Sequence, residues 1–114
     1  MPDQPLTYTI SDGAKEGVVV VTISGPFTLG NIFTLQNVLR TVKPPCLIMD
    51  LSQVPFMDSA GLGVVMNYYV SAQGSSRKFF LVGVNDRLKA LMEMTKVDSV
   101  LKCYDTLDSA EAQA

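Results

Sequence analysis

An aspartate, a serine and two glycines lie close together in the run FMDSAGLG at positions 56–63. The run joins a strand-like segment to a helix-like one. We predict that Ser59 caps that helix, because its hydroxyl can accept from the free backbone N–H groups of the first turn. A hydroxyl there is also suited to phosphorylation, since the helix dipole and the free N–H groups favour a phosphate by roughly 0.3–1 kcal/mol. The residues alone leave two interpretations open: a modifiable Ser59 beside Asp58, or a purely structural cap with Asp58 favouring the helix dipole.

Gly61 and Gly63 follow at the start of the same helix. Each glycine costs a helix about 1 kcal/mol relative to alanine. The pair therefore predicts a close approach at the helix start, either by another part of the chain or by the backbone of a partner.

Catalytic chemistry has little support elsewhere in the chain. The sequence contains no histidine, which excludes Ser-His-Asp and Cys-His nucleophile systems and every His-ligated metal. It has no GxSxG, SxxK or GxxxxGK[ST] motif, and no CxxC pair. Cys46 and Cys103 are expected to be small buried hydrophobic residues rather than a disulfide. We therefore predict a protein that is not an enzyme and has no catalytic residue, metal or cofactor.

Composition and charge narrow the class of protein. The 114 residues suit one domain, which we expect to cover 1–114 with a core at about 6–108. Nine basic residues are scattered among eleven acidic ones, and the net charge of −2 argues against binding to nucleic acid. The N-terminus has no secretory core, and the apolar stretch at 18–21 is far too short to span a bilayer. We expect a cytoplasmic protein that does not bind membranes.

Hydrophobic periodicity predicts an α/β fold. Strand-like segments occur at 6–10, 18–23, 46–51, 78–82 and 101–104. Helix-like segments occupy 31–42, the stretch from Ser59 to Gly74, the region after Asn85 as cap, and 106–114 with Thr106 as cap. Strands that alternate with helices after an opening hairpin indicate a mixed sheet, mostly parallel with one antiparallel strand, and about four helices.

The helix that starts at Ser59 has a predicted core stripe with helical spacing, formed by Leu62, Val65, Met66, Tyr69 and Val70. Val64 and Tyr68 would then point away from the core. Together with Met57 they could form an exposed apolar patch that binds a partner. Burial in a layered domain is the alternative.

The run FMDSAGLG closely resembles the signature of STAS domains, in particular of bacterial anti-sigma factor antagonists, and the run ISGPF at 23–27 is similar to the same family. The resemblance covers nearly the whole chain and implies a STAS-like fold. It also implies that a partner serine kinase, which doubles as an anti-sigma factor, phosphorylates Ser59. The unphosphorylated protein would bind that anti-sigma factor, phosphorylation would release it, and a phosphatase would reverse the switch. Asp58, Ala60, Gly61 and Gly63 would be the neighbours of the switch site.

Two positions differ from many members of that family. Ala60 stands where many relatives carry Ser or Thr, which leaves Ser59 as the only hydroxyl at this helix start. Thr28 stands where many relatives have Asp in the loop after the second strand. In those relatives the loop lies close to the switch serine, so the threonine bears on how this protein would meet its kinase. Because a fold does not fix a function, a scaffold or accessory subunit of a stress-sensing or transport complex is the alternative role.

Overall fold

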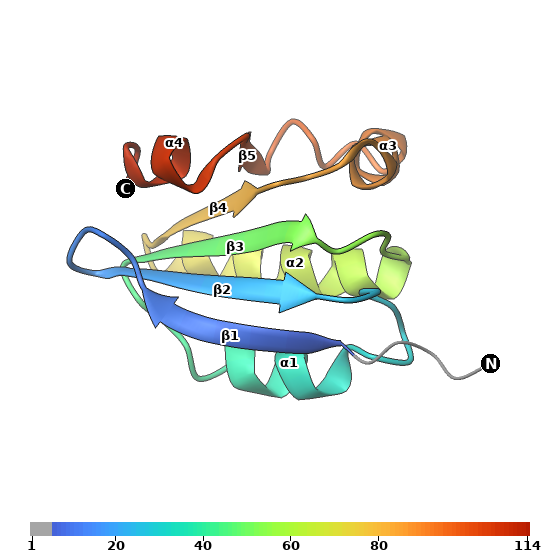
Figure 1. Ribbon diagram of the computed structural model, residues 1–114, viewed down its shortest axis with the longest axis horizontal. Helices are drawn as coiled ribbons and strands as arrows, with labels where there is room; N and C mark the ends of the chain where they lie inside the picture. Colours follow the sequence, from blue (N-terminus) through green and yellow to red (C-terminus); the bar gives the residue numbers. More distant parts are fainter. Residues whose placement is uncertain (1–5) are drawn as a thin grey trace.

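A five-stranded sheet forms the centre of the computed structural model, which describes residues 6–114 (Figure 1). The strands are β1 (Thr7–Asp12), β2 (Val18–Ser24), β3 (Cys46–Gln53), β4 (Lys78–Val82) and β5 (Lys102–Tyr104). They lie side by side in chain order, β1-β2-β3-β4-β5. β1 pairs with β2 antiparallel, and all the other pairs are parallel. This mixed sheet confirms the fold expected from the sequence.

The β-branched run of β2 is buried on both faces of the sheet, as its composition predicts. Val21 and Ile23 point into the larger hydrophobic core, whereas Val18 and Val20 point into a smaller core on the opposite face. β1 is the edge strand beside it, and five of its six residues are exposed. The two sides of the sheet therefore carry separate apolar clusters, and each cluster needs a covering element.

Four helices provide that cover. Three of them, α1 (Phe33–Leu39), α2 (Ser59–Gly74) and α3 (Asp86–Met94), contribute side chains to the larger core, and α1 and α2 lie behind the sheet in Figure 1. Each connects two neighbouring parallel strands in the same direction, and right-handed crossovers then place all three on one face. α4 (Leu107–Glu111) follows the last strand and packs on the smaller core. None of the helices within residues 6–114 is long and apolar enough to cross a lipid bilayer.

Local capping sets the ends of these helices. The side chain of Asn85 accepts from the backbone N–H of Leu88 at 2.9 Å, and that of Thr106 accepts from Ser109 at 3.1 Å, so both predicted caps are confirmed. α2 ends at a turn in which Ser76 adopts a positive φ of 56°. The N–H of Arg77 there bonds to the carbonyl of Ala72 at 2.8 Å, a Schellman arrangement with serine where glycine is usual. This turn directs the chain straight into β4.

The predicted core stripe of α2 is partly wrong. Leu62 and Val65 are buried as expected, but so are Val64 and Tyr68, whereas Val70 is 62% exposed. The sheet and the neighbouring α1 together bury a wider part of the surface of α2 than predicted. The buried side of α2 is turned toward α1. Tyr68 can be buried because its hydroxyl donates to the carbonyl of Val42 at 2.6 Å, in the segment that follows α1.

The two cysteines are free thiols, and no disulfide joins them. Cys46 is buried at the start of β3, as predicted, and its burial raises the pKa of its thiol. Cys103 is exposed, so its predicted burial is wrong. The difference arises because β5 is a three-residue strand at the edge of the sheet.

Candidate functional site

The N-cap of α2 is Asp58 and not Ser59, so the predicted cap is wrong by one residue. Asp58 has extended backbone angles, and its Oδ1 accepts from the N–H of Gly61 at 3.0 Å. Ser59 is the first residue inside the helix. Aspartate and serine cap helices about equally well, so local sequence could not decide between these neighbours.

A tertiary contact accounts for the choice. The second carboxylate oxygen of Asp58, Oδ2, accepts from the N–H of Leu29 in the loop between β2 and α1, at 3.1 Å. Burial by itself pushes the pKa of Asp58 up, but the N–H groups of Gly61, Leu29 and Ala60 outweigh it and hold the pKa below its usual value. Asp58 is therefore a carboxylate at neutral pH, and it ties the β2–α1 loop to the start of α2.

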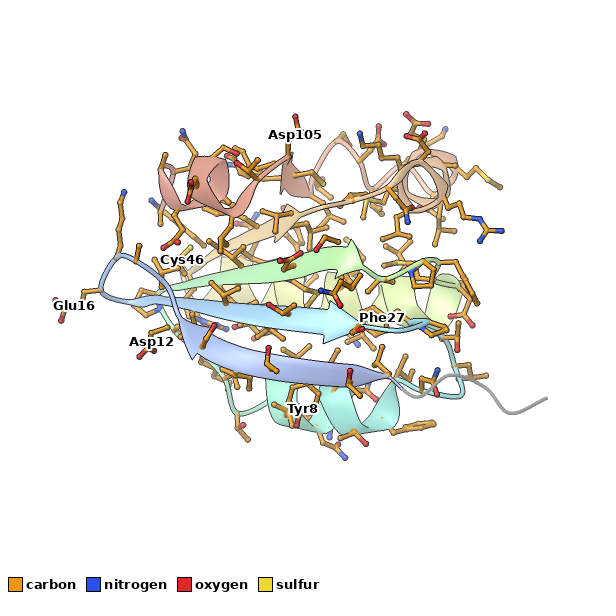
Figure 2. The ribbon with its side chains drawn as sticks, in the orientation of Figure 1. Tyr8, Asp12, Glu16, Phe27, Cys46 and Asp105 are labelled. Atoms are coloured by element: carbon orange, nitrogen blue, oxygen red, sulfur yellow. The ribbon has the colours of Figure 1, made fainter. Side chains whose placement is uncertain are left out.

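Backbone contacts bring the same two segments together. The N–H of Phe27 donates to the carbonyl of Phe56 at 3.1 Å, and the N–H of Asp58 donates to the carbonyl of Phe27 at 3.3 Å. Phe27 also forms an isolated parallel bridge with Met57. Figure 2 shows Phe27 just beyond the carboxyl end of β2, where it is fully buried. Thr28, between Phe27 and Leu29, is thus held beside the start of α2, where the family resemblance placed this loop.

The two glycines of α2 have different surroundings. A Cβ atom on Gly61 would clash with the carbonyl oxygen of Phe27 and lie 3.3 Å from the Cβ of Met57. A Cβ atom on Gly63 would meet nothing within 4 Å among the described residues. The predicted close approach within the chain therefore exists at Gly61 and not at Gly63.

Ser59 itself is exposed to solvent. Within residues 6–114 its hydroxyl makes no hydrogen bond. The hydroxyl therefore stands at the first turn of a 16-residue helix, next to an ionised carboxylate, and is accessible to another molecule.

The exposed apolar patch predicted from Met57, Val64 and Tyr68 does not exist, because all three side chains are buried. Two other apolar residues, which no sequence pattern marks as a surface patch, are exposed near Ser59 instead. Leu29 is 59% exposed and Phe56 is 41% exposed. Both lie in loops, where no helical or strand period marks an exposed apolar side chain in advance. The guanidinium of Arg87 lies 5.8 Å from the centre of the Phe56 ring, which adds a cation to this surface.

Comparison with known proteins assigns the family. The family model described as STAS domain matches residues 10–110. The chain belongs to the STAS domain family. The Asp58–Ser59 pair thus lies at the α2 N-terminus of a STAS domain, as the resemblance of the run at 56–63 implied.

Individual STAS relatives span different shares of the chain. A relative from Thermotoga maritima is 34% identical over 64 residues, which cover 56% of this chain and 57% of that protein. The anti-sigma-F factor antagonist RsfB of Mycobacterium tuberculosis is 29% identical over 112 residues, covering 96% of this chain and 88% of RsfB. The crystal structure of an anti-sigma factor antagonist from Mycobacterium paratuberculosis superposes with a TM-score of 0.86 at 29% identity, covering 99% of this chain and 96% of that one.

Proposed function

We propose that this STAS domain is an anti-sigma factor antagonist that is switched by phosphorylation of Ser59. The observation that carries the proposal is the exposed Ser59 hydroxyl in the first turn of α2, beside the Asp58 carboxylate. The names of the relatives RsfB and the Mycobacterium paratuberculosis antagonist support it. The proposed role is regulatory and needs no catalytic residue in this chain.

In the unphosphorylated state, the exposed side chains of Leu29 and Phe56 would form part of the surface that binds the anti-sigma factor. Apolar side chains beside a polar centre are typical of a protein–protein contact. Binding of the antagonist to the anti-sigma factor would release the sigma factor.

Phosphorylation would weaken that complex by charge. A phosphoserine adds about −1.5 to −2 charge and three acceptor oxygens. At Ser59 this charge would stand next to the ionised Asp58, in the centre of the interface. Like or mismatched charges at an interface cost several kcal/mol, and every 1.4 kcal/mol is about tenfold in affinity. The helix dipole and the N–H groups of the first turn would accommodate the phosphate in the free protein, so no change of fold is required.

The phosphoryl transfer would use Ser59 as the nucleophile and the kinase for the remaining chemistry. The Oγ of Ser59 would attack the γ-phosphorus of ATP, the bond from that phosphorus to ADP would break, and the hydroxyl proton would leave to a base. Both oxygens of Asp58 already accept backbone N–H groups, from Gly61 and Leu29. Asp58 therefore suits a positioning role, and the kinase would supply the Mg²⁺ and the base.

The test is intact mass spectrometry after incubation with ATP, Mg²⁺ and the cognate anti-sigma kinase, followed by calorimetric titration of each form against the same kinase. Ser59→Ala is the control. The proposal requires that wild type gains one phosphoryl group, that Ser59→Ala gains none, and that the phosphorylated form binds at least about a hundredfold more weakly. If neither protein is modified and both bind one large assembly equally well, the proposal fails and the scaffold role is supported.

A further inference from the structure

A polar pocket lies at the opposite end of α2 from Ser59. It is a cavity of about 370 Å³ between the last turns of α2, the start of β4, β5 and the segment after α4. β5 begins opposite Phe80, so the first two residues of β4 extend past their neighbouring strand and leave space at the sheet edge. The start of β4 and the end of α4 lie on the left in Figure 1, whereas α2 begins on the right. With 16 residues, α2 spans about 24 Å between the two sites.

The walls of this pocket are positively charged. Three of the nine basic residues of the protein line it, namely Arg77, Lys78 and Lys102, and no Asp or Glu of residues 6–114 does so. The whole chain has a net charge of −2, so the charge of this pocket is opposite in sign to the net charge of the protein. A concave site with one sign of charge concentrates ions of the opposite sign.

These positive charges have neutral partners. The Nη1 and Nη2 atoms of Arg77 donate to the hydroxyls of Tyr68 and Ser71, each at 3.1 Å. The Nε of Arg77 is a buried donor without an acceptor among the described residues. The Nζ of Lys78 donates to the carbonyl of Gln113 at 3.1 Å. None of these contacts neutralises a cation, but the guanidinium nitrogens of Arg77 are engaged or buried, so Lys78 and Lys102 are the cations that can contact a bound anion directly.

The remaining walls offer hydrogen-bond donors and aromatic surface. The Tyr69 hydroxyl accepts from the Nε2 of Gln73 at 3.0 Å, which leaves its own proton to donate. Tyr104 meets Phe80 edge to face, with ring centres 5.3 Å apart. Cations and hydroxyls bind phosphate oxygens through charge-assisted hydrogen bonds, and aromatic rings provide a flat apolar wall.

We propose that this pocket binds a small organic phosphate. Its phosphate group would lie between Lys78 and Lys102 near Arg77, and its flat apolar body would pack against Phe80 and Tyr104. The site is separate from Ser59 and does not depend on the proposed function.

The test is an NMR titration of the ¹⁵N-labelled protein with phenyl phosphate, with phenol and inorganic phosphate titrated separately. Lys102→Glu removes one exposed cation of the pocket. Lys89→Glu, on the exposed side of α3, is the matched control with the same change of charge. Phenyl phosphate should give saturable shifts at amides that line the pocket. A lost charged hydrogen bond should weaken binding about tenfold or more in Lys102→Glu and leave Lys89→Glu within about twofold of wild type.

Three results would overturn the proposal. The first is shifts that do not saturate or that spread over the whole surface. The second is equal weakening in both charge variants, which would mean a general effect of net charge. The third is inorganic phosphate or phenol binding as tightly as phenyl phosphate, which would remove the role of the aromatic wall or of the cations.

Discussion

Alanine at each of the two glycines of α2 should have opposite effects on stability. At both positions alanine gains about 1 kcal/mol of helix propensity over glycine. At Gly63 the new methyl group meets nothing within 4 Å, so Gly63→Ala should be stabilised by up to about 1 kcal/mol. At Gly61 the methyl group would overlap the carbonyl oxygen of Phe27.

The Phe27 carbonyl cannot move aside freely. The carbonyl of Phe27 accepts from the N–H of Asp58 at 3.3 Å, and the N–H of Phe27 donates to the carbonyl of Phe56 at 3.1 Å. Relief of the overlap would stretch or break these hydrogen bonds, each worth about 0.5–1.5 kcal/mol. Overpacking typically costs about 1–3 kcal/mol. With the loss of one of these hydrogen bonds included and the gain in helix propensity subtracted, Gly61→Ala should be destabilised by about 0.5–3.5 kcal/mol. If Gly63→Ala gains the full helix propensity, the two variants should differ by about 1.5–4.5 kcal/mol.

Urea denaturation followed by circular dichroism measures this difference directly. A thermal scan should separate the variants as well, since about 1 kcal/mol shifts the Tm of a domain of this size by roughly 4 °C. A Gly61→Ala protein as stable as wild type would refute the argument, because it would mean that the β2–α1 loop yields at no cost. Equal destabilisation in Gly63→Ala would refute it too, since the Phe27 contact could not then be the cause.

Four further outcomes follow from other contacts of the structure. Asp58→Ala should lose about 1 kcal/mol of stability in urea denaturation as the N-cap, whereas Ser59→Ala should change it by less than about 0.5 kcal/mol; the reverse order would restore Ser59 as the cap. The folded pKa of Asp58 is lowered, so its contribution to stability is present above the ordinary aspartate pKa and is lost as pH falls through the folded value. Stability of wild type relative to Asp58→Asn should thus shrink on acidification below about pH 4, and a constant difference would contradict the assignment. Glu111→Ala should cost about 1–3 kcal/mol, since Glu111 accepts from the N–H of Ala14 at 2.6 Å, and Glu111→Gln should recover part of it; equal losses in urea melts would point to packing instead. Ser76→Gly should stabilise the turn after α2 by up to about 1 kcal/mol, because glycine adopts its φ of 56° without strain, and a loss of stability would contradict this.

The strands and the caps of α3 and α4 were predictable from local pattern. The β-branched run of β2 and the caps at Asn85 and Thr106 depend on residues within one element, and the structure has them where the sequence placed them. The cap of α2 was not predictable, because the contact that distinguishes Asp58 from Ser59 comes from Leu29, 29 residues earlier in the chain.

The prediction of which face of α2 is buried was partly wrong for a similar reason. Hydrophobic spacing identifies a helix, but the choice between Val70 and Tyr68 as the buried residue depends on where α1 packs and on the carbonyl that Tyr68 finds at Val42. The exposed side chains of Leu29 and Phe56 likewise become apparent only once the two loops are placed together. Contacts within an element could mostly be read from the sequence, whereas of the contacts between elements only the close approach at Gly61 was indicated.

The order of the strands has a consequence for how the chain folds. Because β1 to β5 are neighbours in chain order, each β–α unit can add to the edge of the sheet that already exists, although every parallel pair must close a crossover that contains a helix. The bond between Glu111 and Ala14 joins positions 97 residues apart and can form only after the last strand is in place. Until α4 packs against the sheet, the smaller apolar core, which includes Val20 and Ile48, is exposed to solvent. Detachment of α4 should therefore be an early step of unfolding, and amide hydrogen exchange should be faster in α4 than in β3.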